Sequence, residues 1–208
     1  MSKAGSIAKI TIKTIVLAIS LFIYAFFIFR LCSTGSAPDS VSGIVWNDIT
    51  RAAYAADPDG FEIYTQEPST FITDDGRFWI SDVVYLPDAK QLQFTVKYND
   101  STLKYLKQAL GDDSLVLPDE PFDYSVLDNS GNRYHTHSSF SEKEQNYNYR
   151  RLVFEDIVIP ENTVFYVDMY YVGSINYEAI PYGSLQVWNT ALDIEEIDVN
   201  DVLPDDLK

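Results

Sequence analysis

The chain has 208 residues, with 15 basic and 31 acidic side chains, two histidines, one cysteine and a net charge of −16 at pH 7. So acidic a surface repels the phosphates of nucleic acids, which excludes nucleic-acid binding as the main function. A single cysteine excludes an intrachain disulfide, and a chain of this length can bury a stable core without one.

Residues 10–32 predict a transmembrane helix. The run from Thr14 to Phe29 carries no charge and would extend about 24 Å as a helix. At roughly 1.5 Å per residue, the whole stretch exceeds the roughly 30 Å hydrocarbon core of a bilayer. We therefore expect this segment to anchor the chain, with the lipid bilayer as its first partner.

Charge predicts the orientation of this helix. Lys3, Lys9 and Lys13 precede or begin the apolar run, and residues 1–32 contain no acidic residue. Basic flanks stay on the cytoplasmic side of a membrane. We therefore expect residues 1–9 in the cytoplasm and the rest of this single-pass protein outside the cell membrane.

A cleavable signal peptide is the alternative for the same residues. Gly35 and Ala37 form a small-x-small site behind the apolar run. The length of that run and the charge of Arg30 before the site favour an uncleaved anchor. Cleavage would instead produce a secreted β-sandwich protein.

After the anchor, the sequence predicts a linker, a domain and a tail. Residues 33–42 are small and polar, which is typical of a short tether. Residues 43–192 are expected to form an extracytoplasmic domain. Residues 193–208 hold seven acids and one lysine, a composition typical of a solvated acidic tail.

A helix is expected to lead into this domain. Apolar residues recur at helical spacing between residues 41 and 56. Asp39 or Ser40 can cap the start of this helix, and Asp57-Pro58 ends it.

The chain from residue 61 onward predicts a mainly β fold. Between Gln91 and Tyr98, apolar and polar residues alternate strictly, so one face of this strand should lie in a core. Residues 99–110 predict a short helix with Asn99 or Asp100 as its cap. The expected strands are Phe61–Thr65, Arg77–Leu86, Gln91–Tyr98, Phe122–Leu127, Arg133–Thr136, Tyr149–Ile159, Thr163–Val172 and Ser184–Leu192.

Turn signals at regular spacing between these strands favour an antiparallel, Ig-like β-sandwich with one or two short helices. Its core should draw on strands from both halves of the chain. The residues expected in that core are Leu92, Phe94, Val96, Phe154, Phe165, Val167 and Val187.

Three stretches carry a resemblance: RAAYAADPDGFEIYTQEP, GRFWISDVVYLPDAKQLQFTVKYNDSTLKYL and YRRLVFEDIVI. They resemble segments of uncharacterised bacterial single-span membrane proteins that carry a small exported β-sandwich domain. The resemblance covers residues 45–190. It implies a location and a fold class, but no activity and no catalytic residue.

His135 and His137 are the two histidines of the chain. On a strand, this spacing places both imidazoles on one face and can chelate a metal. The polar, Ser-rich surroundings and the lack of a helix-borne HExxH motif favour an exposed strand end instead. We therefore expect no metal site and no cofactor, with these two histidines as the candidate ligands if a metal binds.

Calcium stays an open alternative because aspartates are abundant. The pairs Asp57/Asp59, Asp74/Asp75 and Asp112/Asp113 lie beside glycine or proline, as in ordinary turns. None matches the calcium-binding loop pattern D-x-[DN]-x-[DN]-G.

The aromatic residues give the candidate ligand surface. The chain has 15 tyrosines and three tryptophans, and exposed rings of this kind stack on sugars and other flat ligands. Arg150 and Arg151 are expected to pair with nearby carboxylates rather than with a ligand. The ligand-surface candidates are Tyr147, Tyr149, Tyr177 and Tyr182, with Trp79 as a further ring.

No GxSxG motif, phosphate-binding glycine loop or external cysteine nucleophile occurs. We therefore expect no catalytic residues and a binding function. The first hypothesis is a membrane-anchored extracytoplasmic module that binds an envelope protein. The alternatives are a cell-wall glycan or carbohydrate binder and, third, an enzyme that uses a carboxylate pair.

Overall fold

The computed structural model describes residues 3–33, 37–66, 70–111, 116–172 and 179–208. The chain divides into two compact units, residues 1–37 and residues 38–208. Each unit is described by itself.

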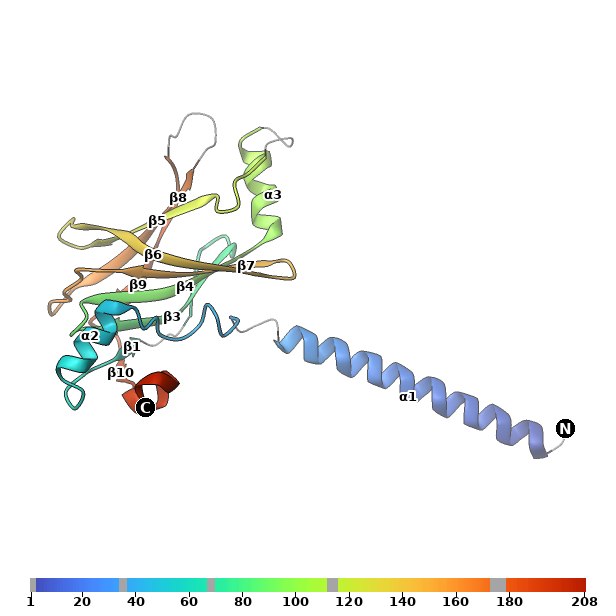
Figure 1. Cartoon of the computed structure of the whole chain (residues 1–208). Coiled ribbons are helices and arrows are strands. Elements are labelled where there is room, and N and C mark those ends of the chain that lie inside the picture. Colours follow the sequence, from blue (N-terminus) through green and yellow to red (C-terminus); the bar gives the residue numbers. More distant parts are fainter. Residues whose placement is uncertain (1–2, 34–36, 67–69, 112–115, 173–178) are drawn as a thin grey trace. The chain divides into compact units, whose positions relative to one another are not determined.

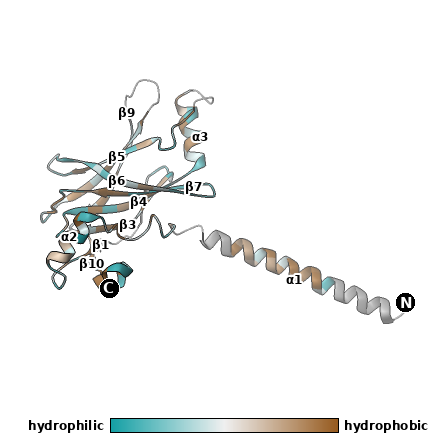
Figure 2. Ribbon diagram, in the orientation of Figure 1, coloured by the Kyte–Doolittle hydropathy of each residue, from teal (hydrophilic) through white to brown (hydrophobic). Residues whose placement is uncertain are grey.

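The first unit is the helix α1 (Lys3–Ser33). Its described side chains, residues 13–28, are exposed and mostly apolar, as the brown ribbon in Figure 2 shows. Within the described residues, no helix is both long and apolar enough to cross a bilayer. The structure therefore does not support the transmembrane helix predicted over residues 10–32.

The second unit is an antiparallel sheet with few helices, so the mainly β prediction is confirmed (Figure 1). The strands are β1 (Tyr64–Gln66), β2 (Thr70–Ile72), β3 (Phe78–Leu86), β4 (Gln91–Asn99), β5 (Phe122–Asp128), β6 (Arg133–Glu144), β7 (Tyr147–Phe154), β8 (Val164–Val172), β9 (Ala179–Asn189) and β10 (Ile194–Glu196). The helices are α2 (Asp48–Ala56), α3 (Asp100–Ala109), α4 (Val199–Val202) and the 3-10 turn η1 (Asp205–Leu207).

The strands form one curled sheet rather than the two separate sheets of the predicted sandwich. Its order is β10-β1-β3-β4-β7-β6-β5-β8-β9, with β2 paired to β3. The strand β6 joins the halves, because its first residues pair with β5 and its later residues pair with β7. On the opposite side of the curl, β9 lies against β2 and β3.

One large apolar core fills the inside of the curl. The stacked rings of Phe94 and Phe154, with centroids 5.3 Å apart, join β4 to β7 there. The residues predicted for the core all lie in this cluster with no exposed surface: Leu92, Phe94, Val96, Phe154, Phe165, Val167 and Val187. The alternation read from Gln91 to Tyr98 therefore gave the correct buried face.

The leading helix begins later than expected, at Asp48 with Asn47 as its cap, although it ends at Ala56 as expected. The preceding residues instead lie along the outer face of β4. The side chain of Gln93 accepts from Val45 N–H at 2.8 Å and donates to Val45 O at 3.1 Å. Because buried glutamines on this face need such partners, extended backbone fits here and a helix does not.

The expected solvated tail over residues 193–208 is instead ordered. The strand β10 pairs with β1, and Leu203 is buried. Arg51 of α2 holds Asp206 at 2.6 Å, and the indole of Trp46 donates to Val202 O. The apolar residues between the acids therefore attach the end of the chain to the domain.

Candidate functional site

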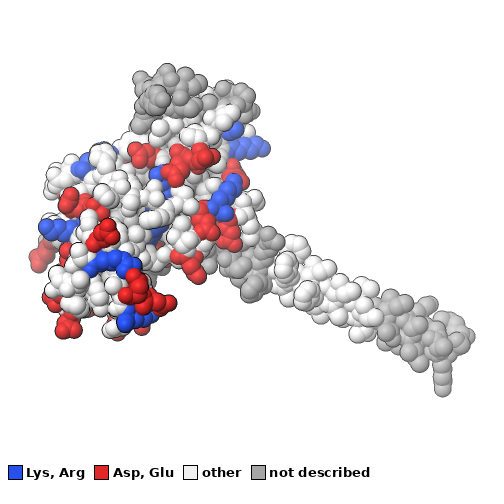
Figure 3. Space-filling model, viewed as in Figure 1, with Lys and Arg blue, Asp and Glu red and all other residues white. Residues whose placement is uncertain are grey.

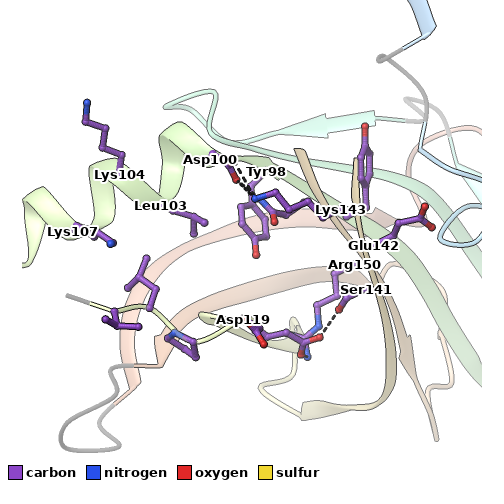
Figure 4. Close-up of a pocket in the computed structure, with 16 residues that line it drawn as sticks. Tyr98, Asp100, Leu103, Lys104, Lys107, Asp119, Ser141, Glu142, Lys143 and Arg150 are labelled. Atoms are coloured by element: carbon purple, nitrogen blue, oxygen red, sulfur yellow. Dashed lines mark hydrogen bonds and ion pairs between the residues drawn. The ribbon is translucent and has the colours of Figure 1, made fainter. Parts of the chain in front are cut away.

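A pocket of about 1050 Å³ opens between α3, the β6–β7 hairpin and the segment that leads into β5 (Figure 4). This volume is at the upper end of the range for small-ligand sites. The lining residues come from three parts of the chain: Tyr98–Lys107, Val116–Glu120 and Ser141–Arg150.

The pocket exists because β5 and β6 separate. Arg133–His135 of β6 pair with Leu127–Ser125 of β5. Beyond this point the two strands diverge (Figure 1), and β6 continues along β7 alone as far as Glu144. A register shift between Thr136 and Ser138 lies where the separation begins, and such a bulge bends a strand and increases its twist.

Arg150 crosses the opening between the two strands. Its guanidinium donates to Phe122 O at 2.7 Å and to Ser139 Oγ at 3.1 Å. It also forms an ion pair with Glu120 at 2.8 Å, while Ser141 donates to the same carboxylate. The expected pairing with a local carboxylate is confirmed for Arg150, and the pair fixes one side of the pocket. It is wrong for Arg151, which donates to Asp82 O, Thr95 Oγ1 and Gln93 Oε1.

A second ion pair fixes the other side. Lys143 on β6 contacts both carboxylate oxygens of Asp100 at 3.0 and 3.1 Å, and Asn148 donates to the same group at 3.1 Å. Asn99 caps α3 by accepting from Thr102 N–H, as predicted. The cap places Asp100 in the first turn of α3, where a carboxylate is favoured by the helix dipole.

Tyr98 lies at the inner end of the pocket. Only 5% of this residue is exposed, and its ring packs against Phe78 and Phe122. In Figure 4 its hydroxyl points into the cavity. Burial raises the pKa of Tyr98 to about 12, with Arg150 opposing the rise, and no hydrogen bond contributes.

Cations are concentrated at this pocket. Four of the basic residues of the domain line it, namely Lys104, Lys107, Lys143 and Arg150. Among the described residues, Lys104 and Lys107 contact no carboxylate. Elsewhere on the visible face, Lys and Arg lie scattered among Asp and Glu (Figure 3). The same lining carries four acids, namely Asp100, Asp119, Glu120 and Glu142, so the pocket brings together charges of both signs.

The predicted ring surface at Tyr147 and Tyr149 forms part of a row across three strands. Trp79 of β3, Lys97 of β4 and Tyr149 of β7 are cross-strand neighbours. The ammonium of Lys97 lies 4.3 Å from the Tyr147 ring centroid and 5.4 Å from that of Tyr149. Burial lowers the pKa of Lys97. The ring faces of this row are therefore already occupied by a cation of the chain.

The remaining two tyrosine candidates do not extend this surface. Tyr182 donates to Asp75, and its ring packs on Phe78 with centroids 4.8 Å apart. Burial raises its pKa above the ordinary value, and the bond to Asp75 adds to the rise. Tyr182 therefore closes one end of the core. Tyr177 lies outside the described residues.

The two histidines are exposed on β6. His137 lies at the register shift and contacts Glu155 at 3.1 Å through Nδ1. In the part of the chain that the structure describes, no three His, Cys, Asp or Glu side chains gather to hold a metal ion. Of the aspartate pairs, Asp112/Asp113 falls outside the described residues.

The sequence analysis singled out Tyr149 and Arg150, which line the pocket, but missed the other residues that make it. Tyr98 was assigned to a strand, Lys104 and Lys107 to a helix, and residues 116–120 to no element. One signal was available: a domain with 31 acids places three of its few basic residues between Lys97 and Lys107. That clustering indicates an electrostatic feature on one element.

The lining side chains offer charges, hydroxyls and an amide but neither histidine nor cysteine. Such a set suits hydrogen bonding and ion pairing with a polar ligand.

Comparison of the chain with family models, with curated proteins and with solved structures found no match.

Proposed function

We propose that this protein is a non-catalytic binding module whose ligand occupies the pocket beside α3. The observation that carries the proposal is the hydroxyl of Tyr98, which points into the cavity from an almost completely buried residue and makes no hydrogen bond to the described residues. A hydroxyl that opens into a pocket can donate a hydrogen bond to, and accept one from, a ligand atom or water. The pocket's size and mixed lining support the same function.

We further propose that α1 holds the module at the outer surface of a cell membrane, with residues 1–9 in the cytoplasm. The support is a long series of exposed apolar side chains on α1, each more than two-fifths exposed. Exposed apolar surface of this extent marks a contact with lipid or another apolar surface. The lysines before it supply the charge asymmetry.

The binding proposal is tested with the full chain in lipid nanodiscs. Two sets of probes are offered, a pool of linear peptides and a pool of chitin-type oligosaccharides, and binding is followed by saturation-transfer NMR. A probe from either pool should bind the native chain and lose contact with the double variant Lys104→Glu/Lys107→Glu. The double variant Lys90→Glu/Lys208→Glu makes the same charge change elsewhere and should bind normally. Equal binding to both variants would refute the pocket as the site.

The anchor is tested by fractionation. The chain should remain in the membrane pellet after an alkaline carbonate wash and should retain Lys3 at its mature N-terminus. External protease on wall-stripped cells should remove the domain and leave a small protected fragment. A soluble form that begins after Ala37 would instead show cleavage and secretion.

A further inference from the structure

The strand β6 has two differently paired parts. Arg133–His135 pair with Leu127–Ser125 of β5. Ser138–Glu144 pair with Val153–Tyr147 of β7 on one edge only. Among the described residues, no strand pairs with the other edge. This edge borders the pocket, because Ser141 and Lys143 line it.

We infer that the ligand of the pocket is an extended polypeptide segment of a partner protein, which adds as a strand to the open edge of β6 at Ser138–Glu144. The inference rests on the proposed function and names the ligand class for the same site. An open edge offers N–H and C=O groups at regular spacing, and extended peptides bind such edges through main-chain hydrogen bonds. Seven residues at roughly 3.4 Å each make an edge about 20 Å long, enough for a typical strand.

The pocket would then select the side chains of the added strand. Alternate residues of a strand point to the same face, so every second side chain of the peptide would enter the cavity. There it meets Leu103, Leu117 and the hydroxyl of Tyr98. In Figure 4 the side chain of Lys107 extends toward the cavity, whereas that of Lys104 extends away from the other labelled residues. These groups favour an apolar residue followed, two positions later, by a polar or charged one.

Charge distinguishes a partner protein from a second copy of this chain. The domain carries far more acidic than basic residues, so two copies repel each other at close range. A peptide segment of low net charge in another protein would not meet that repulsion. A glycan would use the cavity but could not form the ladder of main-chain bonds along β6.

The test selects linear 12-residue peptides by phage display on the full chain in nanodiscs, with counterselection on empty nanodiscs. We expect the selected peptides to alternate apolar residues with polar or charged ones. Affinity of the synthetic peptide should fall about tenfold or more for Lys104→Glu/Lys107→Glu, as the loss of one or two ion pairs predicts. The charge-matched control Lys90→Glu/Lys208→Glu should bind as the native chain does, and thermal unfolding checks that both variants fold.

Two measurements separate strand addition from other modes. N-methylation of alternate peptide bonds should weaken binding about tenfold, because each methyl removes a main-chain donor. Bound peptide should slow amide exchange within Ser138–Glu144. Binding that tolerates N-methylation, or protection confined to β9 or β10, would overturn the inference.

The outcomes also separate this inference from the proposed function. If no peptide is selected but an oligosaccharide binds in a manner that requires Lys104 and Lys107, the pocket is a ligand site and the strand-addition inference is wrong. If neither probe class binds, both are wrong. Self-association that requires the β6 edge would replace the partner protein by a second copy and overturn the inference.

Discussion

The curled sheet is closed in one region and open in another, and the two regions differ in chemistry. Where β4 and β7 face β5, β8 and β9, apolar side chains such as Phe94 and Phe165 fill the space completely. Where β5 leaves β6, the space is bridged by ion pairs of Arg150 and Lys143 and stays hollow. The difference indicates that the closed region holds the fold and the open region is free to bind.

Truncation of a phenylalanine should show the largest difference between the two regions in the loss of unfolding free energy. Phe94→Ala removes a fully buried ring of the closed region and should lower the free energy of unfolding by about 3–5 kcal/mol. Phe140→Ala on β6 removes a ring that is 47% exposed and should cost less than about 1 kcal/mol. Chemical denaturation measures both. Equal costs would mean that the open region is also core.

Tyr98 lies between the closed and the open region, and the ionisation of its hydroxyl should make the stability of the domain depend on pH. Its pKa rises to about 12 in the folded state from an ordinary value near 10. A raised folded pKa contributes stability that is complete below about pH 10 and is lost as pH rises toward 12. The stability of the native chain relative to Tyr98→Phe should therefore fall by about 2–3 kcal/mol between pH 9 and 12.

The Tyr98 comparison uses denaturation curves of both chains at each pH. The other tyrosines titrate in both, so the difference reports Tyr98 alone. The matched control is Tyr171→Phe, which removes the hydroxyl of another buried tyrosine away from the pocket. Its stability difference from the native chain should depend on pH in a different way from that of Tyr98→Phe. A pH-independent difference for Tyr98→Phe would show that the hydroxyl is not buried against the core.

The outer face of β4 is a third region. It is covered by the extended backbone of residues 41–47, which forms hydrogen bonds with Gln93 and Thr95. Gln93→Leu keeps the size of the side chain but removes its hydrogen bonds to the partly buried N–H and C=O of Val45, whose C=O then keeps only the bond from Thr50 Oγ1. The free energy of unfolding should fall by about 2 kcal/mol. Gln108→Leu, on the exposed side of α3, should change it by less than about 0.5 kcal/mol.

The smallest effect on stability should come from the pocket itself. Lys104→Glu/Lys107→Glu changes two side chains that contact no carboxylate among the described residues, so unfolding should shift by less than about 1 kcal/mol. The same variant should lose ligand binding. Substantial destabilisation would place these lysines in the structural framework instead.

Local patterns predicted the closed region well. The alternation of residues 91–98 gave the buried face of β4, and Asn99, one of the two predicted cap residues, caps α3. Both depend on neighbours in sequence, which periodicity and capping report directly. The same reasoning failed for residues 41–47, where apolar spacing indicated a helix but Gln93 and Thr95 bind the extended backbone.

The open region could not be predicted because it depends on contacts between distant residues. Nothing near Arg133 or Ser141 indicates that β6 changes partner within its length. The acidic composition of residues 193–208 likewise concealed the pairing of β10 with β1. The candidate site at Tyr147 and Tyr149 was chosen from ring type alone, and Lys97, opposite on β4, decides its role.

Residue-resolved amide hydrogen exchange of the free full chain tests the central claim most directly. In a closed sheet, residues of β4 and β7 that pair on both sides are strongly protected. We predict that alternate amides within Ser138–Glu144, those directed away from β7, exchange orders of magnitude faster than the amides of Leu92–Val96. Uniform protection along β6 would show that its edge is already occupied, and would contradict both the open region and the strand addition inferred from it.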